Sequence, residues 1–176
     1  MRLFKGLSIA IATTLASTVS AVATPSSQIE LTYQASQIQC GANAPQMVIG
    51  VDVYQNGQAI AEDMRVGDSV MVSSLDNITM EYSIVANGGN CTSLASPTEM
   101  HVVEPSDIPS LPGYGDQDSI ATLLSQLESY EDLYLVELGT TNTSSTAYDL
   151  QDVVFIVNNN PTSPSVTPTP PISFAD

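Results

Sequence analysis

The sequence contains very little positive charge. Its 176 residues include three Lys or Arg against 19 Asp or Glu, which gives a net charge of −16 at pH 7. Proteins hold the phosphates of nucleic acids and of anionic lipids mainly through Lys and Arg, and an acidic chain is repelled by both. We therefore expect neither nucleic acid nor an anionic membrane surface as a partner. The acidity itself indicates either solubility outside the cell or cation binding. Cation binding must be argued from particular clusters of acidic residues.

Histidine and tryptophan are equally scarce. His101 is the only histidine, and tryptophan, the usual platform for sugars, is absent. An enzyme that needed an imidazole base would have to use His101, and no G-x-S-x-G sequence marks a nucleophile. A lone histidine within an apolar strand is more often solvent-facing or hydrogen-bonded. Hydrolysis by paired carboxylates is the enzymatic alternative, although 19 acidic residues give many chance pairs.

The N-terminal residues have the features of a secretory signal peptide. Arg2 and Lys5 precede a mostly apolar run at 7–15, and the Ala-Val-Ala sequence at 21–23 is a small-x-small cleavage sequence. This predicts that residues 1–23 are removed and that the protein is secreted, periplasmic or at the cell surface. No stretch is long and apolar enough to predict membrane insertion after cleavage.

Export determines how the two cysteines are interpreted. Outside the cytosol, Cys40 and Cys91 are most simply one disulfide. A bridge closing a loop of about fifty residues stabilises a fold by roughly 4 kcal/mol in the chain-entropy treatment. A reactive or metal-binding pair is the alternative, which the wide spacing and the lack of a nearby histidine disfavour.

Apolar residues between the cysteines alternate with a period of two. The segments 47–54 and 78–86 show this pattern, which predicts half-buried strands. Asn56-Gly57 follows the first segment and is a strong signal for a type I′ hairpin turn. Further strands are predicted at 29–33, at 59–60 as a short return strand, and at 69–74, 100–103, 133–138 and 153–157. The succession predicts a mainly β fold: a single antiparallel β-sandwich domain over residues 24–157, immunoglobulin-like in general architecture.

Two segments depart from this pattern. Ile120, Leu123, Leu124 and Leu127 share one helical face and predict an amphipathic α-helix within 115–130, crossing or plugging one end of the sandwich. Residues 158–176 are rich in Pro and Thr and predict a disordered tail. This tail would be an inert end, a spacer, or a peptide that adds a strand to another subunit.

Acidic residues near the end of the predicted helix form the first candidate metal site. Spacings of three and four place Glu128 beside Glu131 and Asp132 on one helical face. Carboxylates there oppose the helix dipole unless a cation compensates them, and calcium prefers such oxygen ligands. No D-x-D-x-D-G loop accompanies them, so a solvated acidic face is the alternative.

A second candidate contact lies just before the helix. Tyr114, Asp116 and Asp118 could meet calcium, a carbohydrate or a partner protein, because a tyrosine beside a turn can expose its ring. Asn77, Asn90 and Asn142 each begin an Asn-x-Ser/Thr sequence, which matters only where secreted proteins are glycosylated.

The sequence thus predicts an exported, non-catalytic interaction module associated with a cell surface, a matrix or fibres. Its expected partners are a protein or polysaccharide at the cell surface, with self-association as a further possibility. No cofactor is expected other than calcium. A calcium- or carbohydrate-binding module is the alternative function, and a carboxylate-dependent hydrolase is the third.

Overall fold

The protein is mainly β. A computed structural model describes residues 28–41, 43–112 and 116–162. These residues form eight strands, one α-helix and two short 3-10 turns. The strands are β1 (Ile29–Ala35), β2 (Val48–Gln55), β3 (Gln58–Met64), β4 (Ser69–Val72), β5 (Ile78–Ala86), β6 (Thr98–Val102), β7 (Glu131–Glu137) and β8 (Val153–Asn158). The helix is α1 (Asp116–Gln126), and the 3-10 turns are Leu75–Asn77 and Pro105–Asp107.

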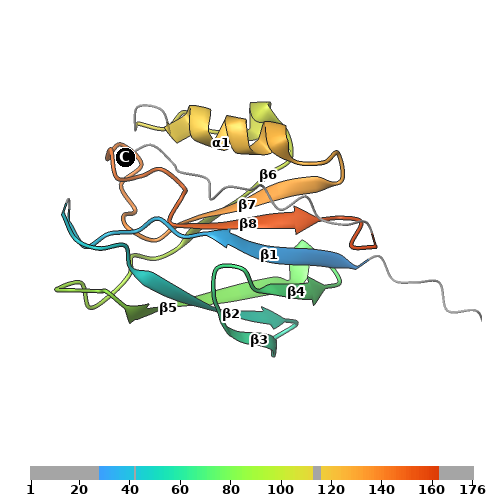
Figure 1. The fold of residues 1–176 in the computed structure, drawn as a ribbon, viewed down its shortest axis with the longest axis horizontal. Coiled ribbons are helices and arrows are strands. Elements are labelled where there is room, and N and C mark those ends of the chain that lie inside the picture. Colours follow the sequence, from blue (N-terminus) through green and yellow to red (C-terminus); the bar gives the residue numbers. More distant parts are fainter. Residues whose placement is uncertain (1–27, 42, 113–115, 163–176) are drawn as a thin grey trace, which may run out of the picture.

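The strands form two antiparallel sheets that lie one above the other (Figure 1). The larger sheet has the order β4-β1-β8-β7-β6, and the smaller has the order β3-β2-β5. The mainly β, antiparallel prediction is therefore confirmed. Only part of the pairing is between neighbours in sequence, because β1 lies between β4 and the C-terminal strand β8.

The space between the sheets is filled by one apolar core. Val51 and Val53 of β2 are fully buried there with Phe155 of β8. Tyr33 of β1 packs against Phe155 with ring centroids 5.1 Å apart. Burial raises the pKa of the Tyr33 hydroxyl to about 12. The period of two along β2 thus corresponds to one face that is buried between the sheets.

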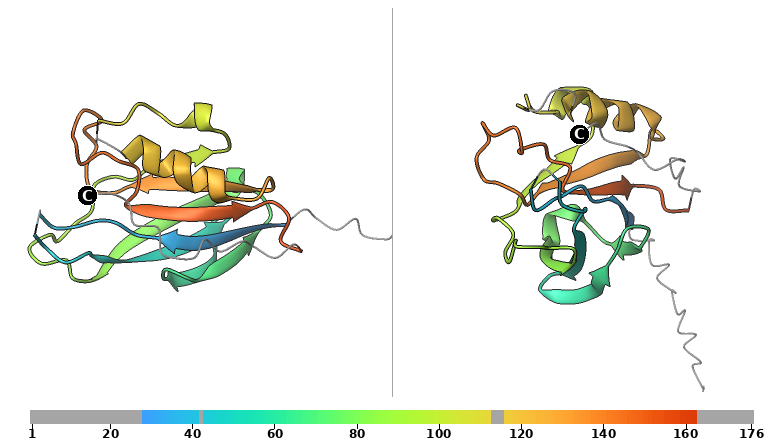
Figure 2. Two further views of the ribbon diagram at one scale, coloured as in Figure 1. Left: turned by 45° about the horizontal axis from the view of Figure 1, so that its top comes forward. Right: turned by 60° about the vertical axis from the view of Figure 1, so that its left-hand side comes forward.

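Helix α1 covers the outer face of the larger sheet, as both views in Figure 2 show. Ile120 and Leu123 are buried with Leu133 of β7 and Ile156 of β8 in a second apolar cluster. The amphipathic helix is confirmed, whereas its expected place at an end of the sandwich is wrong. The nearly continuous burial of β7 and β8 explains the difference, since apolar side chains lie on both faces of these strands and the outer face needs a cover.

Two local predictions are also confirmed. Asn56 and Gly57 both have positive φ, 52° and 76°, as a type I′ turn requires. Cys40 and Cys91 form a disulfide with a Cα–Cα distance of 5.7 Å. The bridge joins the segment before β2 to the loop after β5.

The strand after the turn is longer than expected. β3 spans Gln58–Met64 and is an edge strand with mostly exposed side chains, so apolar alternation could not reveal it. The register shifts opposite Asp52, where Asp63 takes a positive φ of 57° and its N–H donates to Asp52 Oδ1 at 2.6 Å. A bulge of this kind protects a sheet edge against further pairing.

The folded chain continues past the predicted domain end at 157. Asn158 belongs to β8, and the N–H of Asn159 donates to the Tyr130 carbonyl at 2.8 Å. The remainder of the predicted tail, 163–176, and the predicted signal peptide lie outside the described residues. Within the described part of the chain, no helix has the length and apolar character needed to span a membrane.

Candidate functional site

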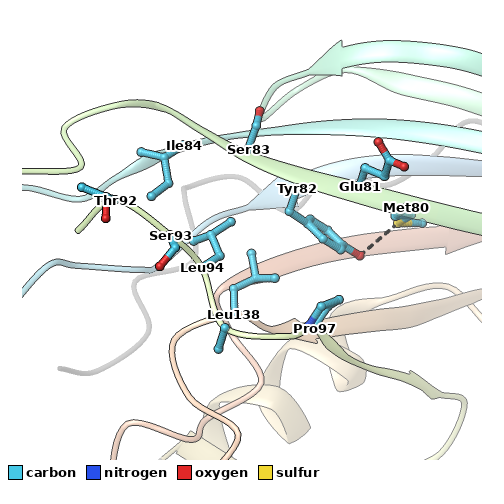
Figure 3. Close-up of a pocket in the computed structure, with 11 residues that line it drawn as sticks. Met80, Glu81, Tyr82, Ser83, Ile84, Thr92, Ser93, Leu94, Pro97 and Leu138 are labelled. Atoms are coloured by element: carbon cyan, nitrogen blue, oxygen red, sulfur yellow. Dashed lines mark hydrogen bonds between the residues drawn. The ribbon is translucent and has the colours of Figure 1, made fainter.

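A groove runs along strand β5, at the open side of the two sheets. β5 is the edge of the smaller sheet and pairs only with β2. A hollow of about 590 Å³ lies between β5 and the segment 92–97, which leads into β6. The residues that line it are Met80, Glu81, Tyr82, Ser83, Ile84, Thr92, Ser93, Leu94, Ala95, Pro97 and Leu138 (Figure 3).

Strand alternation gives this groove an apolar floor. The side chains of Met80, Tyr82 and Ile84 pack at the border of the core, and Glu81 and Ser83 point away from it (Figure 3). Leu94 and Leu138 complete the floor from the other side. Because β5 pairs only with β2, its other edge forms one wall of the groove and offers unpaired backbone N–H and C=O groups to a ligand.

A carboxylate held by two tyrosines borders one end of the groove. The hydroxyl of Tyr82 donates to Glu99 Oε1 at 2.7 Å, and that of Tyr134 donates to Oε2 at 2.7 Å. Burial, and then the Glu99 carboxylate, raise the pKa of both hydroxyls well above the ordinary tyrosine value. Both phenols thus remain donors at neutral pH, and they fix the position of Glu99.

His101 follows Glu99 on the same face of β6. Its Nε2 lies 3.4 Å from Asp132 Oδ2, an ion pair when the imidazole is protonated. Asp132 Oδ2 also accepts a hydrogen bond from Asn159 Nδ2 at 2.6 Å. His101 thus lies at the surface beside one carboxylate.

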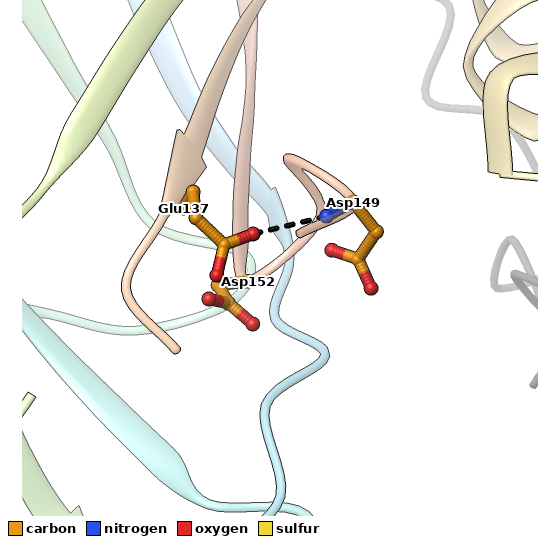
Figure 4. A group of neighbouring side chains, drawn as sticks. All are labelled: Glu137, Asp149 and Asp152. Atoms are coloured by element: carbon orange, nitrogen blue, oxygen red, sulfur yellow. Dashed lines mark hydrogen bonds between the residues drawn. The ribbon is translucent and has the colours of Figure 1, made fainter. Parts of the chain in front are cut away.

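Three carboxylates meet where β7 ends and β8 begins. Glu137 ends β7, Asp152 directly precedes β8, and Asp149 lies in the loop between them (Figure 4). Each offers a ligand atom, and the three atoms lie within 4.8 Å of one another. Glu137 and Asp152 are buried, with 0% and 4% of their surfaces exposed. We call this group the acidic triad.

The carboxylate of Glu137 anchors both ends of the loop 139–152. Oε1 accepts from the N–H groups of Gly139 and Thr140 at 2.9 and 3.0 Å. Oε2 accepts from those of Asp149 and Leu150 at 3.1 and 3.2 Å. Four backbone donors stabilise negative charge on this buried carboxylate.

Asp152 is the second buried carboxyl group of the acidic triad. Its Oδ2 accepts from the N–H groups of Leu138 and Gly139, both at 2.6 Å. Burial and then the charge of Glu137 raise the pKa of Asp152 to about 8. The raised pKa favours the protonated form of Asp152 beside Glu137, and a divalent cation could take the place of that proton. The acidic triad could therefore hold a metal ion.

The predicted metal ligands Glu128, Glu131 and Asp132 do not share a helical face. α1 ends at Gln126, and Glu131 and Asp132 begin β7, so the helical spacing argument is wrong. The three residues do line one hollow of about 300 Å³. In the described part of the chain, however, the acidic triad is the only group of three whose ligand atoms converge within 4.8 Å. Metal binding by Glu128, Glu131 and Asp132 stays a prediction.

The other predicted contact residues are only partly visible. Tyr114 lies outside the described residues. Asp116 and Asp118 belong to the first turn of α1, and the structure does not describe their side chains. A ligand or partner contact there likewise stays a prediction.

Sequence reasoning missed both the tyrosine-held carboxylate and the acidic triad. Tyr82 and Tyr134 lie within predicted strands, which gives no sign of their hydroxyl contacts, and Glu99 is one of 19 acidic residues. A usable signal existed for the triad, since Glu137 and Asp152 each sit at the end of an apolar strand facing the same loop.

Comparison of the chain with known protein families, curated proteins and solved structures finds no match.

Proposed function

We propose that this chain is an exported, non-catalytic interaction module that binds an extended polypeptide segment in the groove along β5. The observation that supports this is the position of the groove, a hollow of about 590 Å³ directly beside a free strand edge. An extended segment can add a strand to such an edge through main-chain hydrogen bonds, while its alternate side chains enter the hollow.

The other sheet edges suit this role less well. β4 has four residues, and β3 carries the bulge at Asp63. β6 has five residues, whereas β5 has nine. A bulge or a short edge strand limits pairing, and a long edge strand beside a hollow favours it.

The disulfide and the predicted signal peptide support a secreted, periplasmic or cell-surface location, where disulfides persist. The proposal therefore places the partner outside the cytosol, at a cell surface, in a matrix or on fibres. An immunoglobulin-like arrangement of the two sheets is part of the same proposal, since such sandwiches commonly display edges and loops to partners.

A peptide selection tests this function. A random heptapeptide library is screened against the purified exported protein, and the enriched peptides are measured against the Leu94→Asp variant. Leu94 lines the groove, and the matched control is Val66→Asp, which changes a residue that is 57% exposed and does not line it. We expect peptides that lose binding to Leu94→Asp and keep it to Val66→Asp. Equal binding to both variants, or no enrichment, would contradict the proposal.

A calcium-binding module is the second proposed function, and it rests on the acidic triad. Three carboxylates within 4.8 Å match the oxygen ligands that calcium prefers. The buried position of Glu137 and Asp152 means that calcium would stabilise the loop 139–152 and with it the whole fold.

A further inference from the structure

We infer that the segment bound along β5 carries a lysine or arginine whose side chain pairs with Glu99. In that segment the basic residue stands two positions from an apolar residue. The inference rests on the proposed function and adds the chemical character of the partner. It makes the carboxylate held by Tyr82 and Tyr134 the residue that determines specificity.

Glu99 is built to accept a further donor. Each of its carboxylate oxygens accepts one phenol hydrogen bond, although a carboxylate has about four lone-pair sites in all. The side chain is also exposed, so a partner can reach it. Its position is fixed from two sides, which reduces the conformational entropy that binding would otherwise cost.

Among the residues that the structure describes, no Lys or Arg pairs with Glu99. Arg65 is the only Lys or Arg among residues 28–41, 43–112 and 116–162. Its guanidinium pairs with Asp63 and lies directly over Gly50, where a Cβ atom would collide with it. Gly50 alternates with the buried Ile49 and Val51, so Arg65 occupies the outer face of the smaller sheet. The nearby His101 is directed to Asp132.

Strand geometry sets the spacing of the partner's side chains. Ile84 and Leu94 lie at one end of the groove, and Met80 and Pro97 lie at the other, next to the Tyr82 hydroxyl (Figure 3). Side chains on one face of an added strand recur every second residue, about 6.6 to 6.8 Å apart. An apolar side chain between Ile84 and Leu94 therefore places the next inward side chain beside Tyr82 and Glu99.

Two other occupants fit the charge less well. β5 contains Glu81 and no Lys or Arg, so a second copy paired through β5 would offer Glu99 no basic side chain. The C-terminal residues 163–176 contain no Lys or Arg. An extended cationic peptide is the occupant that the groove favours.

The test uses the heptapeptides selected above, together with a synthetic peptide of residues 163–176. Fluorescence anisotropy measures the affinity of each labelled peptide for the wild type, for Glu99→Gln and for the control Glu62→Gln, an exposed acid on β3. Thermal melts first establish that the variants are folded. Each selected peptide is also made with its basic residue replaced by glutamine.

We expect selected peptides with a basic residue two positions from an apolar one. Either Glu99→Gln or the basic-to-glutamine change should weaken binding about tenfold or more, as for a charge-assisted hydrogen bond. The two changes together should cost little more than one, and Glu62→Gln should have no effect.

Groove-dependent peptides without a basic residue, or indifferent to Glu99→Gln, would overturn this inference and leave the proposed function intact. The absence of any groove-dependent peptide would overturn both. Tighter binding of the 163–176 peptide, or growth in mass of the wild type in light scattering that Glu99→Gln does not affect, would assign the groove to this chain itself.

Discussion

The hydroxyl of Tyr82 on β5 lies 2.7 Å from Oε1 of Glu99 on β6. β5 and β6 are edge strands of different sheets, so this hydrogen bond ties the two sheets together at their open side. Tyr134 donates to the second oxygen of the same carboxylate. The contact therefore closes the open side at one end of the groove and leaves the rest of the β5 edge accessible.

Tyr82→Phe should reduce the free energy of unfolding by about 1 kcal/mol, because it removes a short hydrogen bond to a carboxylate. Urea unfolding measures the change. Tyr54→Phe is the matched control, since the Tyr54 hydroxyl lies 3.3 Å from Glu81 Oε2 at an exposed position. Its expected loss is smaller, because water competes for an exposed hydrogen bond. Equal losses for the two variants would contradict a special role for the Tyr82–Glu99 contact.

Asp152 should make the wild type less stable as pH rises. The pKa of this carboxyl is raised from 3.8 to about 8 in the folded protein. Between these values the folded state holds a proton that the unfolded state has lost, so each rise in pH favours unfolding. The stabilising contribution is complete below the lower pKa and is lost as the pH approaches the upper one.

Asp152→Asn should remove this pH dependence, because an amide is neutral and can still accept from Leu138 and donate to Glu137. We expect the variant to gain stability relative to the wild type from about pH 4 to about pH 8, by at most about 1.4 kcal/mol per pH unit. Urea unfolding in the presence of a chelator measures the difference. Parallel curves for the two proteins would refute a raised pKa at this carboxyl.

Calcium should raise the melting temperature if the acidic triad binds it. At one hundred times its dissociation constant, a ligand adds about 2.7 kcal/mol, or several degrees in a domain of this size. Asp149→Asn should abolish the rise, and calcium should also flatten the pH dependence of the wild type, because the ion replaces the proton on Asp152. A melting temperature that is the same in millimolar calcium and in chelator would exclude a stabilising site.

Replacing both cysteines by serine should lower the free energy of unfolding by about 4 kcal/mol, the chain-entropy value for cysteines 51 residues apart. Chemical denaturation of the double variant and the wild type provides the comparison. A loss below about 1 kcal/mol would show that the unfolded chain is not appreciably constrained by the bridge.

Local sequence signals predicted the local parts of this fold. The alternation of Ile49, Val51 and Val53 marks β2 because one of its faces is buried and the other is not. Asn56-Gly57 specifies its turn because both residues tolerate positive φ. The pairing of β1 with β4 and β8 brings distant segments together, and no local pattern encodes it.

The candidate sites were harder to predict, because they depend on buried carboxylates and on contacts between sheets. The spacing of the acidic residues predicted a helical face that included Glu131 and Asp132, whereas the helix ends at Gln126 and both residues begin a buried strand. Acidic residues are expected at the surface, so the burial of Glu137 and Asp152 contradicts the usual rule. Their backbone donors, which make that burial possible, become visible only when the loop 139–152 is in place.

Amide hydrogen exchange of the protein with and without a groove-dependent peptide tests the central claim most directly. Strand addition predicts that alternate amides of β5, those directed away from β2, become protected on binding, while the amides of β3 and β4 keep their exchange rates. Protection of alternate β5 amides would establish the groove as a site for an added strand. Protection at β3 or β4 instead, or none at β5, would contradict the account.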